Sequence, residues 1–494
     1  MENNGSLDYA IPKIVILYIV LFIVHTISVY VPICGIIVGI LELFIIYHFA
    51  ITKNIEYFLL ALCLILPTTY EIPLFALGSK EGILYSCLHM PVLQGYPFQL
   101  ALYIPLLLKG KSLLYTEGDV SILGYRLRII RMFLILFTFV GISVGLFCIF
   151  INDNNIKNID YVKYYMHDFM FIGNSILLLI YFIYAIQNYA LFNKKLLLLI
   201  CAFLISVNIV PPLFSIIGLH GSYGENDIIQ MPLSFFFATS VVFLLMMEQF
   251  SKKQKILFFV LTLISFIVQI KFENALGGKS WLAFFFIIAI LISFYFFKFK
   301  KLSTTIGVFL LTFLGTQIVQ NVDEMSEQNN KLAQATQMLE LTSIDNYDYL
   351  PFSPKVRIEE FINTCIEFTQ KPYFLFGKGF CGSIPDHRNE FGLFVEGAFH
   401  DEEYENNSFV ALHESINVLF LKFGVLGIVF LLFIFYQSFR NYKKCPIVLL
   451  GFMWVILFFN YSLSLALVGI PALVLGMYEI DGDYSSDNAH SPIA

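Results

Sequence analysis

Charged residues are scarce in this chain, whereas large apolar residues are abundant. Of its 494 residues, 13% are Asp, Glu, Lys or Arg, while 58% are hydrophobic and 54 are Phe. The core of one water-soluble protein does not bury that much apolar surface, so the composition predicts a membrane protein. The net charge of −6 is spread over the loops without a basic face, which argues against nucleic acid as a partner.

Several motifs of soluble enzymes are also missing. The sequence contains no P-loop, no Rossmann glycine run, no G-x-S-x-G elbow and no internal repeat, which argues against a soluble nucleotide-dependent enzyme. The eight Cys include no C-x-x-C pair and predict neither a zinc site nor a disulfide framework, although one bridge between Cys365 and Cys381 stays open. The first apolar run lacks a small-residue cleavage site and predicts a span rather than a removable signal.

Apolar runs recur along the whole chain. Because a bilayer core of about 30 Å needs roughly 20 apolar residues per helix, we predict an all-α polytopic membrane protein with roughly 12 to 14 transmembrane helices. The candidate spans are 12–32, 33–52, 56–70, 90–108, 129–151, 169–192, 196–218, 230–250, 256–272, 281–297, 303–320 and 412–437, with one or two more in 446–478.

Lys and Arg residues concentrate in every second connection, as expected for loops that stay in the cytoplasm. This alternation predicts a cytoplasmic N-terminus. It places the long polar segment 321–411 outside the cytoplasm, between the helices of 1–320 and the C-terminal helices of 412–478, and a short polar tail, 479–494, ends the chain.

The polar segment is predicted to contain two amphipathic helices. Apolar residues seven apart indicate one over Met325–Leu341. In "SPKVRIEEFINTCIEFTQKP", Ser353 is a predicted cap, Pro354 suits the first helical position and Lys371-Pro372 ends the helix. One face of this helix is apolar, with Arg357 at its flank; the face comprises Ile358, Phe361, Ile362, Cys365 and Ile366.

Three residues are candidates for chemistry because charges at a membrane boundary are costly unless used or paired. His413 opens an apolar run, and its neutral ring accepts a proton near pH 7; the alternative is a helix-start histidine satisfied by a backbone carbonyl. Arg357 is suited to bind phosphate oxygens or, alternatively, to pair with Glu359 or Glu360. Lys279 follows two glycines and is either a ligand-binding or a snorkelling lysine.

The stretch "PDHRNEFGLFVEGAFHDEEYE" mixes His387, Arg388, His400 and several carboxylates. Histidine and carboxylate side chains are common metal ligands, but neither H-x-x-x-H nor H-E-x-x-H spacing occurs. We therefore predict a solvated, mobile lid rather than a metal site.

The order of these motifs resembles the O-antigen ligase/polymerase family of bacterial integral-membrane glycosyltransferases. That family carries a basic residue before its late spans, then an outer-loop Arg with an aromatic at plus four and a Pro at plus fifteen, then G-x-G, then a His with glycines at plus eleven and plus fourteen. The matching residues here are Lys279, Arg357, Phe361, Pro372, Gly377, Gly379, His413, Gly424 and Gly427. Four positions depart from the family's common residues: Lys279 replaces Arg, Phe361 replaces Trp, Glu414 replaces Asn and Lys422 replaces Glu.

The resemblance implies a GT-C-like architecture in the bacterial inner membrane and a polymerase that joins undecaprenyl-pyrophosphate-linked repeat units into a surface polysaccharide, inverting and without metal or cofactor. His413 and Arg357 would be catalytic, and Lys279, Glu414 and Arg388 would bind substrate. A chain-length regulator and a flippase are implied partners. The alternatives are a ligase that transfers a finished glycan to lipid A core or protein, a flippase of lipid-linked sugars, and a non-catalytic scaffold.

Overall fold

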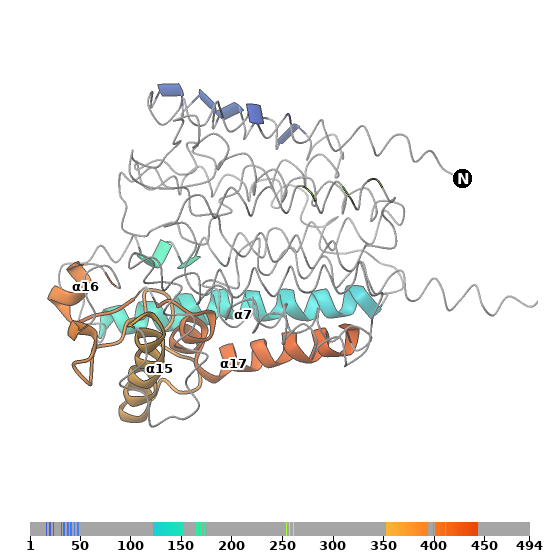
Figure 1. Ribbon diagram of the computed structural model, residues 1–494. Coiled ribbons are helices and arrows are strands. Elements are labelled where there is room, and N and C mark those ends of the chain that lie inside the picture. Colours follow the sequence, from blue (N-terminus) through green and yellow to red (C-terminus); the bar gives the residue numbers. More distant parts are fainter. Residues whose placement is uncertain are drawn as a thin grey trace, which may run out of the picture. The chain divides into compact units, whose positions relative to one another are not determined.

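The computed structural model describes four continuous stretches, 122–151, 352–393, 401–410 and 412–442, together with Phe399 and isolated positions within 16–48, 164–172 and 253–260. The helices are α7 (Ile122–Phe150), α15 (Phe352–Gln370), the 3-10 turn η5 (Phe391–Leu393), α16 (Asp401–Asn406) and α17 (Ser415–Tyr442) (Figure 1). In these stretches the regular secondary structure is helical, and the β-type pairing is one isolated antiparallel bridge between Ile384 and Phe409. Apart from those isolated positions, the remaining predicted spans lie outside the described residues, and so does the Met325–Leu341 helix.

The chain divides into two compact units. One comprises 1–136, 170–266 and 463–494, and the other comprises 137–169 and 267–462. The second unit contains α15, α16, α17 and the part of α7 that begins at Phe137. All candidate site residues that the structure describes belong to this second unit.

Two of the described helices are long and apolar enough to cross a membrane. The qualifying segments are Ile129–Phe150 of α7 and Ile416–Phe433 of α17. Both coincide with predicted spans, 129–151 and 412–437, so helix formation and spanning length are confirmed at these two places. The physical reason is a run of branched and aromatic residues long enough to match the hydrocarbon thickness.

From Phe137 onward, α7 packs along α17 (Figure 1). The ring of Phe137 stacks on Phe423 with centroids 4.2 Å apart and meets Phe430 edge-on at 5.2 Å. Such aromatic pairs add stabilisation beyond the burial of their area. The two helices therefore share one continuous apolar seam.

The α15 helix forms where the sequence predicts it but buries the opposite side. It begins at Phe352, one residue before the predicted cap Ser353, and ends at Gln370, directly before Lys371-Pro372. On its predicted apolar face, Ile358 and Phe361 are 40% and 39% exposed.

The buried side of α15 is its polar side, which comprises Glu359, Glu360, Asn363, Thr364 and Glu367. Carboxylates are buried only where hydrogen bonds and cations satisfy them. Here α17 and the loop after α15 supply those partners, which a pattern of apolar residues does not reveal.

A break in α17 at Gly424 receives the loop that follows α15. Gly424 has φ 58° and ψ −142°, which interrupts the helix. In a continuous helix the N–H groups of Val425 and Leu426 would donate to the carbonyls four residues earlier; here they donate to Phe374 O at 2.9 Å and Leu375 O at 3.3 Å.

The carbonyls released by this break are used by the same loop. Lys378 N–H donates to Leu421 O at 2.8 Å, and Gly379 N–H donates to Lys422 O at 2.9 Å. A Cβ on Gly424 would lie 2.4 Å from Phe374 O, so the loop approaches α17 more closely than a side chain allows.

Close approach also explains the second glycine of the loop. Gly379 has φ 71°, and a Cβ on it would lie 2.2 Å from the backbone nitrogen of Gly145 in α7. The next residue, Phe380, donates its N–H to Gly141 O at 2.9 Å. The loop is thereby bonded to both α7 and α17.

Candidate functional site

The candidate site is centred on a histidine–glutamate pair between α17 and α15. His413, two residues before α17, places Nδ1 2.5 Å from Oε1 of Glu360 on α15. The backbone N–H of His413 also donates to both carboxylate oxygens at 3.1 Å. Glu360 is completely buried, whereas the His413 side chain is 27% exposed.

Asn417 fixes the other side of the Glu360 carboxylate. Its Nδ2 donates to Glu360 Oε2 at 2.9 Å and to the Arg357 carbonyl at 2.9 Å. Phe399 meets the His413 ring edge-on, with centroids 5.3 Å apart. The ring is therefore held by a carboxylate on one edge and an aromatic neighbour beside it.

This geometry assigns different roles to the two nitrogens of the ring. A carboxylate at Nδ1 favours the tautomer in which Nδ1 carries the proton and donates it to Glu360. Nε2 then carries the lone pair, and no residue in the described part of the chain hydrogen-bonds to it. The arrangement orients Nε2 to accept a proton, and Glu360 stabilises the ring when it becomes charged.

Arg357 and Glu414 form an ion pair beside the histidine. Arg357 Nε lies 2.6 Å from Glu414 Oε1, with the Glu414 side chain buried and that of Arg357 partly exposed. Arg357 and Glu360 are three residues apart on α15, and Glu414 follows His413 directly, so the two pairs lie side by side. The pair gives a partner to Glu414, one of the four residues that differ from the common residues of the resembled family.

A third pair joins Arg388 to the same end of α15. Arg388 Nη1 lies 3.2 Å from Oε1 of Glu359, which is completely buried. Burial raises the pKa of the Glu359 carboxyl, and the positive charge of Arg388 opposes that rise. His413, Arg357, Glu414 and Arg388 are therefore brought together, whereas Lys279 lies outside the described residues.

A second charge cluster surrounds Glu367 near the other end of α15. Its carboxylate oxygens lie 2.7 Å from Lys378 Nζ, 2.8 Å from His387 Nε2 and 3.0 Å from Lys371 Nζ. Burial alone would raise the pKa of Glu367, but Lys378 and the hydrogen bonds to its three partners outweigh burial and hold that pKa below its ordinary value. These contacts tie α15 to the loop that enters the break in α17.

Lys422 is another of the four residues that differ from the common residues of the resembled family, and the structure gives it a partner. Buried within α17, it pairs with Oδ2 of Asp168, which also accepts the N–H of Cys381 at 2.9 Å. Asp168 is 254 residues away in sequence from Lys422, so no local pattern indicates the pair.

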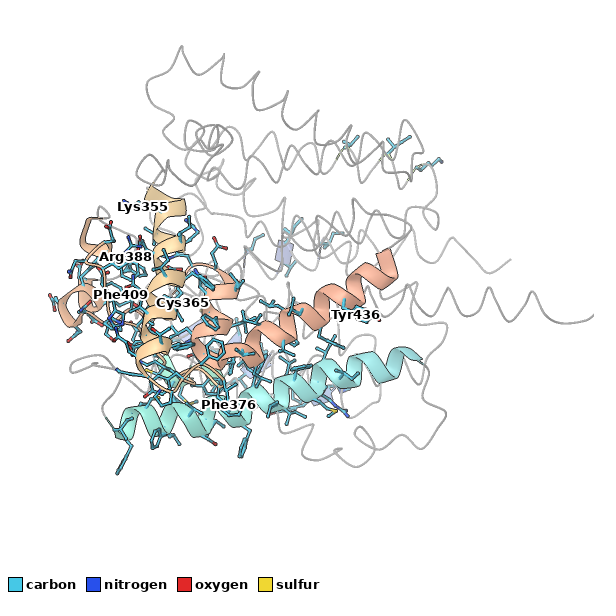
Figure 2. All side chains as sticks on the ribbon, turned by 90° about the horizontal axis from the view of Figure 1, so that it is seen from below. Lys355, Cys365, Phe376, Arg388, Phe409 and Tyr436 are labelled. Carbon is cyan, nitrogen blue, oxygen red and sulfur yellow. The ribbon has the colours of Figure 1, made fainter. Side chains whose placement is uncertain are left out.

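In the described part of the segment predicted to be a solvated lid, charged residues such as Arg388 and Glu402 are exposed, whereas the aromatic residues are packed. Phe391 and Phe399 are buried in an aromatic cluster with Tyr404 and Phe409, and Glu403 is buried and accepts the N–H of Val410 at 2.7 Å. The aromatic residues drive this packing. The polar residues that lie between them along the chain gave no indication of it. Figure 2 shows Arg388 and Phe409 in this packed region beside α15.

One alternative that the sequence left open is answered by the structure, namely a bridge between Cys365 and Cys381. Cys365 and Cys381 are both free thiols, so the open disulfide does not form between them. Among the described residues, no group of three His, Cys, Asp or Glu side chains is arranged to hold a metal ion.

Sequence reasoning missed Glu360, Asn417 and Asp168 as parts of this site. Two spacings in the sequence could have indicated Glu360 and Asn417. Glu360 lies three residues after Arg357 on one helical face, and Asn417 lies one turn after His413. No known family model, no curated protein and no solved structure matches the chain. The site is therefore interpreted from its own geometry.

Proposed function

We propose that this protein is a membrane glycosyltransferase that joins lipid-linked oligosaccharide repeat units into a surface polysaccharide. The observation that carries the proposal is the His413–Glu360 pair, in which Nδ1 is held by a buried carboxylate and Nε2 is left to accept a proton. His413 lies two residues before the start of α17, a helix long and apolar enough to cross a membrane. A lipid tail therefore stays in the bilayer while its head group reaches the histidine.

The proposed reaction is a direct displacement at an anomeric carbon. A hydroxyl of the acceptor sugar attacks that carbon while Nε2 of His413 takes the hydroxyl proton. The bond from the anomeric carbon to the pyrophosphate oxygen breaks, and its electron pair leaves with polyprenyl pyrophosphate. Because attack and departure occur on opposite faces, the anomeric configuration inverts.

Cations near the histidine suit the leaving group. Negative charge develops on pyrophosphate as the bond breaks, and preorganised cations stabilise it. Arg357 engages Glu414 through Nε, and this ion pair holds its guanidinium cation beside the histidine. Arg388 and, in the sequence-based proposal, Lys279 supply further positive charge.

The test is polymer formation by the purified full-length protein in liposomes, with the lipid-linked repeat unit as sole substrate and EDTA present. We expect wild type to form a ladder of products and His413→Ala to slow it by about 10²- to 10⁴-fold. Glu360→Gln is expected to reduce the rate, because the ring loses the carboxylate that orients it. His48→Ala, a histidine remote in sequence from the site, is the matched control and should leave the rate unchanged.

The outcomes separate the competing functions. Unchanged ladders with His413→Ala or Arg357→Ala would overturn the assignment of these residues. Transfer only of a preformed glycan to a lipid A core or protein acceptor would identify a ligase. Movement of the lipid-linked sugar across the bilayer with no new glycosidic bond would identify a transporter.

A further inference from the structure

The loop Tyr373–Phe380 meets both candidate spans near their middles. It exchanges backbone hydrogen bonds with Leu421–Leu426, around the midpoint of the 18-residue segment Ile416–Phe433. Its last residue donates to Gly141 O, near the midpoint of the 22-residue segment Ile129–Phe150. If these two helices cross the bilayer, a non-helical loop lies between them at membrane depth.

The hydrogen bonding of Gly377–Phe380, and of the carbonyls of Phe374 and Leu375, suits such a location. Irregular backbone is tolerated within a bilayer only where its N–H and C=O groups are satisfied by protein. The loop donates from Gly377, Lys378, Gly379 and Phe380, and the N–H groups released by the break at Gly424 return to the carbonyls of Phe374 and Leu375.

The charges beside the loop are satisfied too. Lys378 pairs with Glu367 and donates to Ser383 O, and Lys422 pairs with Asp168. All four charged side chains are buried. Ionisable groups within a bilayer occur where they face protein and are paired in this way.

The tip of the loop presents three consecutive large apolar side chains outward. Phe374, Leu375 and Phe376 are 56%, 60% and 52% exposed, although the loop's backbone is fixed to α7 and α17. In Figure 2, the label of Phe376 lies beyond the C-terminal end of α15. Exposed apolar clusters of this kind mark contact with another apolar phase.

We propose that Tyr373–Phe380 is a re-entrant segment and that Phe374, Leu375 and Phe376 contact the acyl chains of the bilayer. The exposed apolar face of α15, at Ile358 and Phe361, continues toward the same surface, with Phe361 and Phe374 both against Phe420. His413 precedes Gly424 by eleven residues, or roughly 16 Å of helix. The segment thus enters the lipid below the candidate site and holds α15 against the membrane.

The experiment measures the surroundings of the tip directly. In the full-length protein, Leu375 is replaced by p-acetylphenylalanine, and a nitroxide spin label is attached to its ketone. The labelled protein is then reconstituted into vesicles of phosphatidylethanolamine and phosphatidylglycerol. Leu432, exposed on α17, is the lipid-facing reference, and Glu402, exposed on α16, is the water-facing reference. Collision rates with oxygen, which concentrates in lipid, and with a water-soluble nickel chelate are compared.

We expect the label at Leu375 to resemble that at Leu432, with oxygen collisions exceeding nickel collisions several-fold. A label at Phe376 repeats the measurement where the first variant fails to accumulate. Nickel collisions equal to those at Glu402, or shielding from both reagents, would overturn the proposal. The inference goes beyond the proposed glycosyl transfer, and because its readout is not activity, either proposal fails without the other.

Discussion

Three glutamates on the buried side of α15 show how this protein manages charge. Glu359, Glu360 and Glu367 are almost completely removed from solvent, and they meet Arg388, His413 and Lys378, respectively. Each buried carboxylate therefore has a cation or a titratable ring within ion-pair distance. Removing one member of such a pair leaves a charge without compensation, which costs more than the pair itself contributes.

Glu367→Gln should destabilise the folded protein by about 3–5 kcal/mol at neutral pH, because Lys378 stays buried without its carboxylate. The folded pKa of Glu367 lies below its ordinary value of 4.5, so its stabilisation is present above that value and is lost as pH falls through the lower folded pKa. The measurement is thermal unfolding in detergent as a function of pH.

The control for this variant is Glu405→Gln, which removes an exposed carboxylate from α16. It should change the unfolding temperature little at any pH. A deficit for Glu367→Gln that persists undiminished in acid would contradict the assigned direction of the pKa shift.

At the scale of elements, the break in α17 and the loop after α15 act as one joint. Two carbonyls of the loop accept hydrogen bonds from N–H groups of α17, and two N–H groups of the loop donate to carbonyls of α17. These bonds replace the two helical hydrogen bonds that the break removes. The glycines of the G-x-G and the glycine at plus eleven from His413 meet at this joint. Their spacing therefore has a packing reason that is independent of any reaction.

Gly424→Ala should lower the free energy of unfolding by about 2 kcal/mol or more. A side chain is strained at this φ and ψ by roughly 1–3 kcal/mol, and its Cβ would also lie 2.4 Å from Phe374 O. The measurement is the apparent unfolding temperature together with the monodisperse fraction on size exclusion.

Gly392→Ala is the matched control, because a Cβ there meets no atom within 4 Å. It should unfold within a degree or so of wild type. Equal stability of the two variants would show that the joint tolerates a side chain.

For the whole molecule, the charge alternation predicts a definite orientation. The segment before α15 should lie outside the cytoplasm, and the basic sequence 440–444, with Arg440, Lys443 and Lys444, should lie inside. Alkaline phosphatase, which is active only after export, should be active when fused after residue 350 and inactive when fused after Lys444. The reverse pattern would invert the topology and place His413 on the cytoplasmic side.

The apolar runs of the sequence determined the helices α7 and α17, because the length of such a run is matched to the thickness of a bilayer. Sequence also determined the extent of α15 to within two residues, through Pro354 near its start and Lys371-Pro372 at its end. It singled out His413 and Arg357 as candidates by residue type and position. These are local properties, which depend on neighbours a few residues apart.

Only the tertiary structure decided which face of α15 is buried and which groups meet across the fold. Glu360 reaches His413 over 53 residues, and Asp168 reaches Lys422 over 254. The free energy of burying a carboxylate depends on a partner that folding brings close, and no periodicity along the chain encodes that partner. For this reason the sequence predicted a histidine at a helix start, and the fold provided the carboxylate that orients it.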